Sequence, residues 1–288
     1  MIRERWPMRW DIGGAGLWRL ARHALLLSSM LLMSAVCVPA QSAQFKIGGT
    51  GSALATMQLL ADAYTAEHPG TRIKVLPSLG SGGGIKALLS GAIQVAVSAR
   101  PLKDKESKAG ANSVPLSRTP VVFATQSRNQ ATGISEQELV DMLAGKTPEW
   151  PDGTRVRLIL RPVDDSDSRM IKNISSAVRD AKIAAEQRKG MAFAVTDQDA
   201  ADSIEKIPGS LGVSTLAQII SEQRAIKALR WNGVEPGATT LADGSYPLQK
   251  HYVIVTTRKT PAEARDFVAF LESASARAIL AANGQLVD

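Results

Sequence analysis

The sequence predicts an α/β protein with two lobes and a ligand site in the crease between them. The chain has 288 residues, of which 44% are hydrophobic, enough for one large core or two lobes of ordinary size. Strand-like apolar clusters alternate with segments of helical period along residues 41–288. Glycine-rich turns follow two of the predicted strands. In sheets of this kind the ligand binds at the carboxyl ends of the strands, in the crease.

Residues 1–40 have the composition of a secretory signal peptide. Five arginines precede an apolar run from Ala24 to Val38, and Val38-Pro39-Ala40 suits cleavage after Ala40. The run spans about 15 residues, whereas a membrane-spanning helix needs ~20. We therefore expect export to a bacterial periplasm, with a retained N-terminal anchor as the alternative.

Charge and cysteine content exclude several functions. Residues 1–40 carry five basic and two acidic side chains, so their removal lowers the net charge from +7 to +4. No run of Lys or Arg remains and the aromatic residues near basic groups are isolated, which argues against DNA and RNA as partners. The only cysteine, Cys37, leaves with the signal peptide, so the mature chain has no disulfide or thiol chemistry.

The chain up to about residue 100 has the pattern of a βαβαβ unit. Its first helix places Leu54, Met57, Leu60 and Tyr64 on one face and ends at His68-Pro69-Gly70. The predicted elements are strands at 45–48, 72–76 and 93–98 and helices at 52–67 and 83–90.

A second series of elements continues to the end of the chain, without internal repeats or low-complexity tracts. The predicted strands are 120–125, 157–160, 211–214, 226–229 and 252–257, and the predicted helices are 135–143, helices within 166–188, 216–222, 261–272 and 275–283.

Two segments are predicted to cross between the lobes, at residues 116–124 and 246–254. Each combines a proline-marked start with a β-rich run long enough to span both lobes. The resulting division assigns residues 41–118 and 250–288 to lobe 1 and residues 119–249 to lobe 2.

The first candidate site is the turn Gly48-Gly49-Thr50-Gly51-Ser52, between a strand and a helix. Glycines let successive N–H groups point at one spot, and the helix N-terminus adds partial positive charge. This predicts anion binding by Thr50, Gly51 and Ser52. The alternative is a capped helix whose glycines serve only a tight turn.

A second turn of the same kind is Gly80-Ser81-Gly82-Gly83-Gly84-Ile85-Lys86, with Ser81 and Gly82 as candidate ligands. Lys86 does not have the spacing of a phosphate-binding P-loop, which argues against nucleotide hydrolysis. A flexible loop is the alternative. Two such turns at equivalent strand ends favour anion binding.

The third candidate is the segment from Arg161 to Arg169, which follows an apolar strand in the other lobe. Arg161 offers a planar fork of donors for an oxyanion, and Ser166 and Ser168 offer hydroxyls. Asp165 and Asp167 would suit an anion that carries a proton, such as hydrogen phosphate, whereas sulfate has no proton to donate to a carboxylate. The alternative is a helix N-cap by an aspartate, with Arg161 in a salt bridge.

Ser98 and Arg100 end the third strand and form a smaller candidate group. Both could face the crease and contact the anion. An arginine at this place is equally well explained as a salt-bridge partner between the lobes.

An enzyme and a sensor or docking module are the alternatives to a binding protein. An enzyme would use Asp164, Asp165 and Asp167 as a divalent-metal site for phosphoester hydrolysis. However, His68 and His251 have no ligand spacing, and no nucleophile elbow or Cys/His pair is present. We therefore predict no enzyme activity, cofactor or metal. A periplasmic sensor or docking module with the same fold stays open.

The chain resembles the periplasmic phosphate-binding proteins of ABC transporters, which have a class II solute-binding fold. The likeness covers essentially the whole mature chain and is carried by both glycine turns, by Ser98-Ala99-Arg100-Pro101-Leu102, and by the block from Asn232 to Leu248. It implies an exported protein, expected to be a monomer, that captures inorganic phosphate or a related oxyanion and delivers it to an inner-membrane ABC permease.

In that family the ligand is held by groups at the first helix, by a serine of the second turn, and by an arginine with a Ser-Gly-Thr run. The counterparts here are Ser52 with the Ala53 backbone, Ser81, and Arg161 with residues 166–168. The sequence differs from the family at three places. Asp167 replaces a glycine, Ser168 replaces a threonine, and Ala99 stands where the family often places the aspartate that accepts the ligand's proton. Two explanations stay open: Asp165 or Asp167 replaces that carboxylate, or the pocket is tuned for another anion.

Overall fold

A mixed sheet of eight strands organises the part of the chain that the computed structural model describes, residues 43–191 and 193–287. The strand order is β2-β1-β3-β10-β4-β7-β6, and β8 pairs with β4. The predicted signal peptide lies outside the described residues. The strands are β1 (Ala43–Gly49), β2 (Thr71–Val75), β3 (Val95–Ser98), β4 (Ala111–Gln126), β6 (Arg157–Leu158), β7 (Ser210–Thr215), β8 (Ile226–Ala228) and β10 (Gln249–Thr257).

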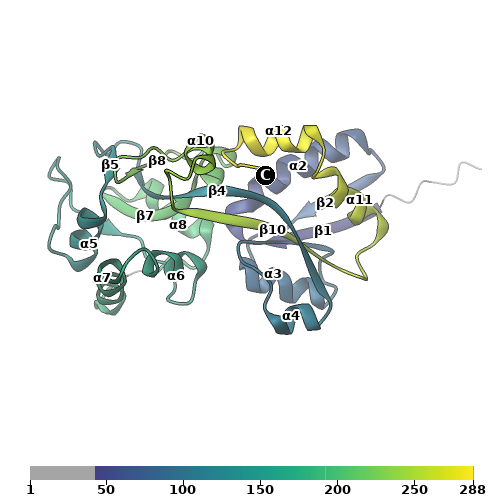
Figure 1. The fold of residues 1–288 in the computed structure, drawn as a ribbon, viewed down its shortest axis with the longest axis horizontal. Helices are drawn as coiled ribbons and strands as arrows, with labels where there is room; N and C mark the ends of the chain where they lie inside the picture. Colours follow the sequence, from purple (N-terminus) through teal and green to yellow (C-terminus); the bar gives the residue numbers. More distant parts are fainter. Residues whose placement is uncertain (1–42, 192, 288) are drawn as a thin grey trace, which may run out of the picture. The chain divides into compact units, whose positions relative to one another are not determined.

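Two long strands, β4 and β10, hold the sheet together. They run antiparallel and side by side in its middle (Figure 1). The first part of β4 pairs with β10, and its later residues pair with β7 and β8. On its other edge β10 pairs with β3, which is parallel to β1. The predicted crossings at 116–124 and 246–254 overlap these two strands, while the lobe boundaries themselves stay a prediction.

Two large clusters of buried apolar side chains form the core. One draws only on residues 121–248, and its Tyr246 also donates from its hydroxyl to the carbonyl oxygen of Val121 at 2.8 Å. The other draws on residues 45–97 and 252–280, with Leu116 and Ala217 added. The two large clusters therefore pack separately on one continuous sheet, beside a third, smaller cluster that includes Ile85 and Leu88.

Helices cover both faces of the strands β1 to β3. The helices α2 (Gly51–Glu67), α11 (Ala262–Phe270) and α12 (Ala274–Ala282) pack together on one face, and α3 (Gly80–Leu89) packs on the other (Figure 1). Both α2 and α3 begin within a few residues of the strand that precedes them. Their N-termini therefore lie at the carboxyl ends of β1 and β2.

The helix α8 (Asp197–Lys206) has no counterpart among the predicted elements. Thr196 and Asp199 form a reciprocal capping box at its start, and Ala200, Ala201 and Ile204 bury its inner face. Thr-x-x-Asp followed by this apolar spacing is a helix signature that could have revealed α8. The pattern was missed because most of the remaining side chains in the segment are polar.

The remaining described elements lie between residues 104 and 242. Among the described residues, no helix combines the length and the apolar character that crossing a bilayer requires. These elements are α4 (Asp104–Lys108), β5 (Gly133–Ile134), α5 (Glu136–Ala144), α6 (Ser166–Lys172), α7 (Ser176–Gln187), α9 (Leu216–Ser221), β9 (Arg230–Trp231) and α10 (Ala238–Ala242).

Candidate functional site

A cleft of about 650 Å³ contains most of the predicted ligands. Its walls come from the N-terminal ends of α2 and α3, from α6 and from the residues that begin α8. The described residues that line it are Thr50, Ser78, Leu79, Gly80, Ser81, Gly82, Arg100, Lys103, Arg161, Asp164, Asp165, Ser166, Arg169, Val195, Thr196 and Asp197.

The N-terminus of α2 is buried and points its first donors at a carboxylate. The amide N–H of Ser52 donates to Oδ2 of Asp197 at 2.9 Å, and the Thr50 hydroxyl donates to the same oxygen at 3.4 Å. First-turn amides have no acceptor within their own helix, and the helix dipole adds partial positive charge. The first glycine turn therefore does present donors to an anion, and that anion is a side chain of this protein.

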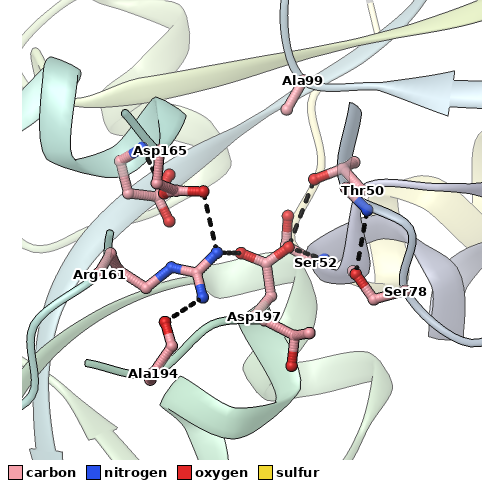
Figure 2. A network of polar contacts seen from close by, with 12 residues as sticks. Thr50, Ser52, Ser78, Ala99, Arg161, Asp165, Ala194 and Asp197 are labelled. Atoms are coloured by element: carbon pink, nitrogen blue, oxygen red, sulfur yellow. Dashed lines mark hydrogen bonds and ion pairs between the residues drawn. The ribbon is translucent and has the colours of Figure 1, made fainter. Parts of the chain in front are cut away.

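Arg161 reaches the same carboxylate from the other half of the chain. Its Nη2 donates to Oδ2 of Asp165 at 3.0 Å and to Oδ1 of Asp197 at 3.4 Å, and its Nη1 donates to the carbonyl oxygen of Ala194 at 2.8 Å (Figure 2). The guanidinium is only 5% exposed, and its Nε has no hydrogen-bond partner among the described residues. A buried, charged donor group with one orphaned N–H is unusual and marks a place where a further acceptor would be favourable.

Asp197 is the central residue of this network, and the sequence analysis did not select it. Its two carboxylate oxygens together accept hydrogen bonds from Ser52, Thr50 and Arg161 (Figure 2). Asp197 is the first residue of α8, so missing that helix also removed Asp197 from consideration.

The hydroxyl of Ser52 is engaged by a buried tyrosine and not by the cleft. Tyr252 on β10 donates to it at 3.0 Å, and burial raises the pKa of Tyr252 to about 12. Ser52 itself is buried and does not line the cleft, and neither do Gly51 and Ala53. The amide of Ala53 donates to the carbonyl oxygen of Thr50 at 3.3 Å. Of the predicted ligands at this helix, Thr50 lines the cleft directly, and the Ser52 amide is bound to Asp197, which also lines it.

The second glycine turn is the first turn of α3 rather than a loop before it. Gly80, Ser81 and Gly82 line the cleft, and Ser81 accepts from the Ala99 amide at 2.9 Å, leaving its own proton available to donate. The two glycine turns lie against each other, because a Cβ atom at Gly84 would be 2.7 Å from the Cα of Gly49.

Ser98 and Arg100 have different surroundings from those predicted. The Ser98 hydroxyl donates to the carbonyl oxygen of Arg100 at 2.8 Å inside a tight turn, so Ser98 is buried outside the cleft. Arg100 does line the cleft, but Glu106 binds its guanidinium through two contacts of 2.7 and 2.8 Å. The hydrogen bond from Arg100 lowers the pKa of Glu106 to about 2. Its salt bridge is with the nearby helix α4, not with the other lobe.

The aspartates and serines that follow Arg161 divide into those that line the cleft and those that are buried outside it. Asp165 and Ser166 line the cleft, and Asp165 also caps α6 by accepting from the amide of Asp167 at 2.9 Å. Asp167 is buried outside the cleft, where its Oδ1 lies 2.5 Å from Nζ of Lys250. Ser168 is buried too and donates to the carbonyl oxygen of Arg161 at 3.1 Å. Of the four residues predicted to contact the anion beside Arg161, Asp165, Asp167 and Ser168 therefore have other partners within the protein, and Ser166 is the remaining one.

Further charged side chains line the cleft that the sequence did not single out. Lys103 and Arg169 join Arg100 and Arg161 as cations that line the cleft, together with the carboxylates of Asp164, Asp165 and Asp197. Arg169 also donates to the backbone carbonyl of Asp164. In the described residues, no group of three or more His, Cys, Asp and Glu side chains has an arrangement suited to a metal ion.

The mixed sheet, the two cores and a polar cleft at the helix N-termini are features of a two-lobed α/β binding protein. The chain belongs to the PBP superfamily, because the family model of the PBP superfamily domain matches residues 38–275. This agrees with the fold class and the family resemblance expected from the sequence.

Individual relatives carry phosphate in their names. The phosphate-binding protein PstS of Bacillus subtilis (strain 168) is 26% identical over 243 residues, which cover 81% of this chain and 76% of that protein. The phosphate-binding protein PstS of Borreliella burgdorferi is 21% identical over 248 residues, covering 83% of this chain and 88% of that protein.

Solved structures show the same fold. A phosphate-bound structure from Clostridium perfringens, described as a candidate substrate-binding protein of a phosphate ABC transporter, superposes with a TM-score of 0.71 at 17% identity, covering 85% of this chain and 99% of that one. An ABC-type phosphate transport receptor from Vibrio cholerae gives a TM-score of 0.58 at 17% identity, covering 85% of this chain and 100% of that one.

Proposed function

We propose that the cleft binds a small tetrahedral oxyanion and that phosphate is its ligand. The observation that carries this proposal is the convergence of the Ser52 amide, the Thr50 hydroxyl and Arg161 on one carboxylate. A set of donors that holds two carboxylate oxygens also suits two oxygens of phosphate. The hydroxyl of Ser81 and the guanidinium of Arg100 line the same cleft and would extend the set.

The proposed role is that of an exported solute-binding protein that passes phosphate to an ABC permease. The names of the relatives in Bacillus subtilis and Borreliella burgdorferi support it, and so does the composition of residues 1–40. We propose that the protein acts in the periplasm and catalyses no reaction. Closure of the two lobes around the anion would bring donors from both halves together, so that the ligand favours the closed arrangement.

Asp165 is the proposed selector of a protonated ligand. It lines the cleft next to Arg161, whereas Asp167, the other predicted candidate, is engaged by Lys250. A hydrogen phosphate ion can donate its proton to the Asp165 carboxylate, and sulfate cannot. We therefore propose that the cleft prefers phosphate over sulfate.

Calorimetric titration with phosphate, sulfate, arsenate and molybdate tests the proposal directly. Arg161→Ala should weaken phosphate binding at least tenfold, because a charge-assisted hydrogen bond contributes ~1.5 to 3 kcal/mol. Arg169→Ala is the matched control. This variant also removes an arginine that lines the cleft. The Arg169 guanidinium is exposed and contacts a backbone carbonyl, so the loss of phosphate affinity should be smaller than in Arg161→Ala.

Unchanged affinity in Arg161→Ala would assign Arg161 a structural role, and no binding of any of the four anions would contradict the proposed function. A phosphatase assay with and without added divalent metal ions tests the absence of catalysis. Metal-dependent turnover would favour the phosphoesterase alternative.

A further inference from the structure

The carboxylate of Asp197 contacts the donors that an external anion would need. It accepts from Ser52 at 2.9 Å, from Thr50 at 3.4 Å and from Arg161 at 3.4 Å. While the Asp197 carboxylate accepts these hydrogen bonds, an external anion cannot accept the same ones with good geometry. The negative charge of the Asp197 carboxylate would also repel an anion that entered the cleft beside it.

We propose that Asp197 is an internal anion that latches the two halves of the cleft together and competes with the external ligand. The latch follows from the contacts of α8 alone, and the competition rests on the proposed function of the cleft. Asp197 thereby sets how tightly an oxyanion can bind.

The latch joins two elements that belong to different cores. The helix α8 packs on β4, β7 and β8. The helix α2 packs on β1 and β2, and it also packs on α9. Beside Asp197, the side-chain amide of Gln198 donates to the carbonyl oxygen of Gly51 at 3.0 Å. Three hydrogen bonds therefore join the start of α8 to the start of α2. Asp197 accepts from the Ser52 amide and the Thr50 hydroxyl, and Gln198 donates to the Gly51 carbonyl.

A close approach at Gly51 makes this contact possible. A Cβ atom at position 51 would lie 2.9 Å from Cβ of Asp197 and 2.4 Å from Oε1 of Gln198. Any side chain at position 51 would therefore push α8 away. The glycine that the sequence assigned to anion binding also admits the internal carboxylate.

Competition follows from the charge of the latch. Displacing the Asp197 carboxylate exposes it to solvent and breaks a contact with a helix N-terminus and a guanidinium, which an incoming anion has to offset. An asparagine at position 197 keeps the shape and one acceptor oxygen but removes the charge. It should hold Ser52 and Arg161 more weakly, because neutral hydrogen bonds are about half as strong as charge-assisted ones.

Asp165 provides a matched control for this charge. It pairs with the same Nη2 of Arg161 at 3.0 Å, closer than Asp197, but its other contact is the cap of its own helix. Removing the Asp165 charge therefore alters Arg161 without touching the junction between α8 and α2.

The experiment compares Asp197→Asn with Asp165→Asn in the full chain carrying Cys37→Ser. Spin labels are attached to cysteines introduced at the exposed positions Lys108 on α4 and Asp180 on α7, and the distance between them is measured in buffer without oxyanions. Phosphate affinity is then measured calorimetrically on the unlabelled variants.

We expect Asp197→Asn to lengthen or broaden the label distance and to strengthen phosphate binding roughly tenfold, the effect of about one charge-assisted contact. Asp165→Asn should leave the distance unchanged and weaken the preference for phosphate over sulfate. An unchanged distance in Asp197→Asn would overturn the latch. Weaker phosphate binding in Asp197→Asn would overturn the competition and make Asp197 a ligand of the anion.

The two proposals can fail separately. If neither the parent chain nor Asp197→Asn bound any oxyanion while the label distance still changed, the proposed function and the competition would be overturned and the latch supported.

Discussion

Asp167 and Asp197 are two buried aspartates, each in the first turn of a helix in the second half of the chain, but their partners differ. Asp167 on α6 faces a single cation, Lys250 of β10, outside the cleft. Asp197 on α8 faces an amide, a hydroxyl and a guanidinium at the cleft wall. Asp167 and Lys250 line a separate cavity of about 300 Å³ next to the cleft, and a carboxylate paired with one lysine in this way is a structural element. A carboxylate that shares several exchangeable donors occupies a place that another anion could take.

The electrostatics of the Asp167 pair support this distinction. Burial alone would lower the pKa of Lys250, but the nearby Asp167 carboxylate outweighs it, and the net effect raises that pKa above its ordinary value. Lys250 therefore stays charged inside the protein, with Asp167 as the largest stabilising influence and Asp197 as a second one. This dependence makes the pair sensitive to the loss of either partner.

The largest predicted effect is on stability. Asp167→Ala leaves the Lys250 ammonium buried without a counter-ion, so we expect the free energy of unfolding to fall by about 3 to 5 kcal/mol. Urea denaturation followed by circular dichroism measures this change. Phosphate affinity of the folded protein should stay within about twofold, because Asp167 does not line the cleft.

A double variant is the control for this prediction. Asp167→Leu combined with Lys250→Met replaces both charges with apolar groups, and such exchanges of buried ion pairs are often neutral or stabilising. Recovery of stability in the double variant is expected. A parent-like stability of Asp167→Ala would show that the pair contributes little and would remove the contrast with Asp197.

The next prediction sharpens the Asp197 side of the comparison. Gly51→Ala inserts a methyl group against Asp197 and Gln198, and overpacking of this kind costs about 1 to 3 kcal/mol. Adding Asp197→Gly should recover part of that loss, because it removes the Cβ atom that the methyl group meets. A thermodynamic cycle from urea denaturation of the four proteins measures the coupling.

Gly82→Ala is the matched control, since its Cβ atom would meet only Nη2 of Arg100, at 3.8 Å. It should change stability by less than about 0.5 kcal/mol. If Gly51→Ala were equally neutral, α2 and α8 would not be held as closely as the structure shows.

The fold could be predicted from the sequence because its elements depend on local patterns. Strand-like clusters and helical periods gave nearly all the long elements, and glycine turns correctly marked the starts of α2 and α3. The helix α8 was missed although Thr196 and Asp199 carry its capping signature. Its inner face consists mainly of alanines, which give a weak apolar period.

The site could be predicted only in part, because contacts between distant segments leave no local signal. Arg161 was recognised from its place after a strand, but its contact with Asp197, 36 residues later, depends on the tertiary fold. Asp167 was favoured because it lies next to recognised residues. In a helix, neighbouring residues face different directions, so Asp165 reaches the cleft while Asp167 points toward β10.

The smallest predicted effect concerns Glu106, whose pair with Arg100 resembles the Asp167 pair but lies near the surface. The hydrogen bond from Arg100 lowers the pKa of Glu106 from 4.5 to about 2, so the folded state favours the ionised carboxylate. The stability that this pair adds is therefore present above about pH 4.5 and lost as the pH falls toward 2. Because solvent-accessible pairs contribute at most about 1 kcal/mol, Glu106→Gln should lower stability by no more than that at pH 6.

At pH 3 the difference in stability between Glu106→Gln and the parent chain should shrink, since part of the parent's advantage has already been lost to protonation. Urea midpoints of both proteins at pH 6 and pH 3 provide the measurement. A difference that stayed constant between the two pH values would mean that the ionised carboxylate of Glu106 adds nothing to stability, and that its pair with Arg100 is no counterpart of the Asp167 pair.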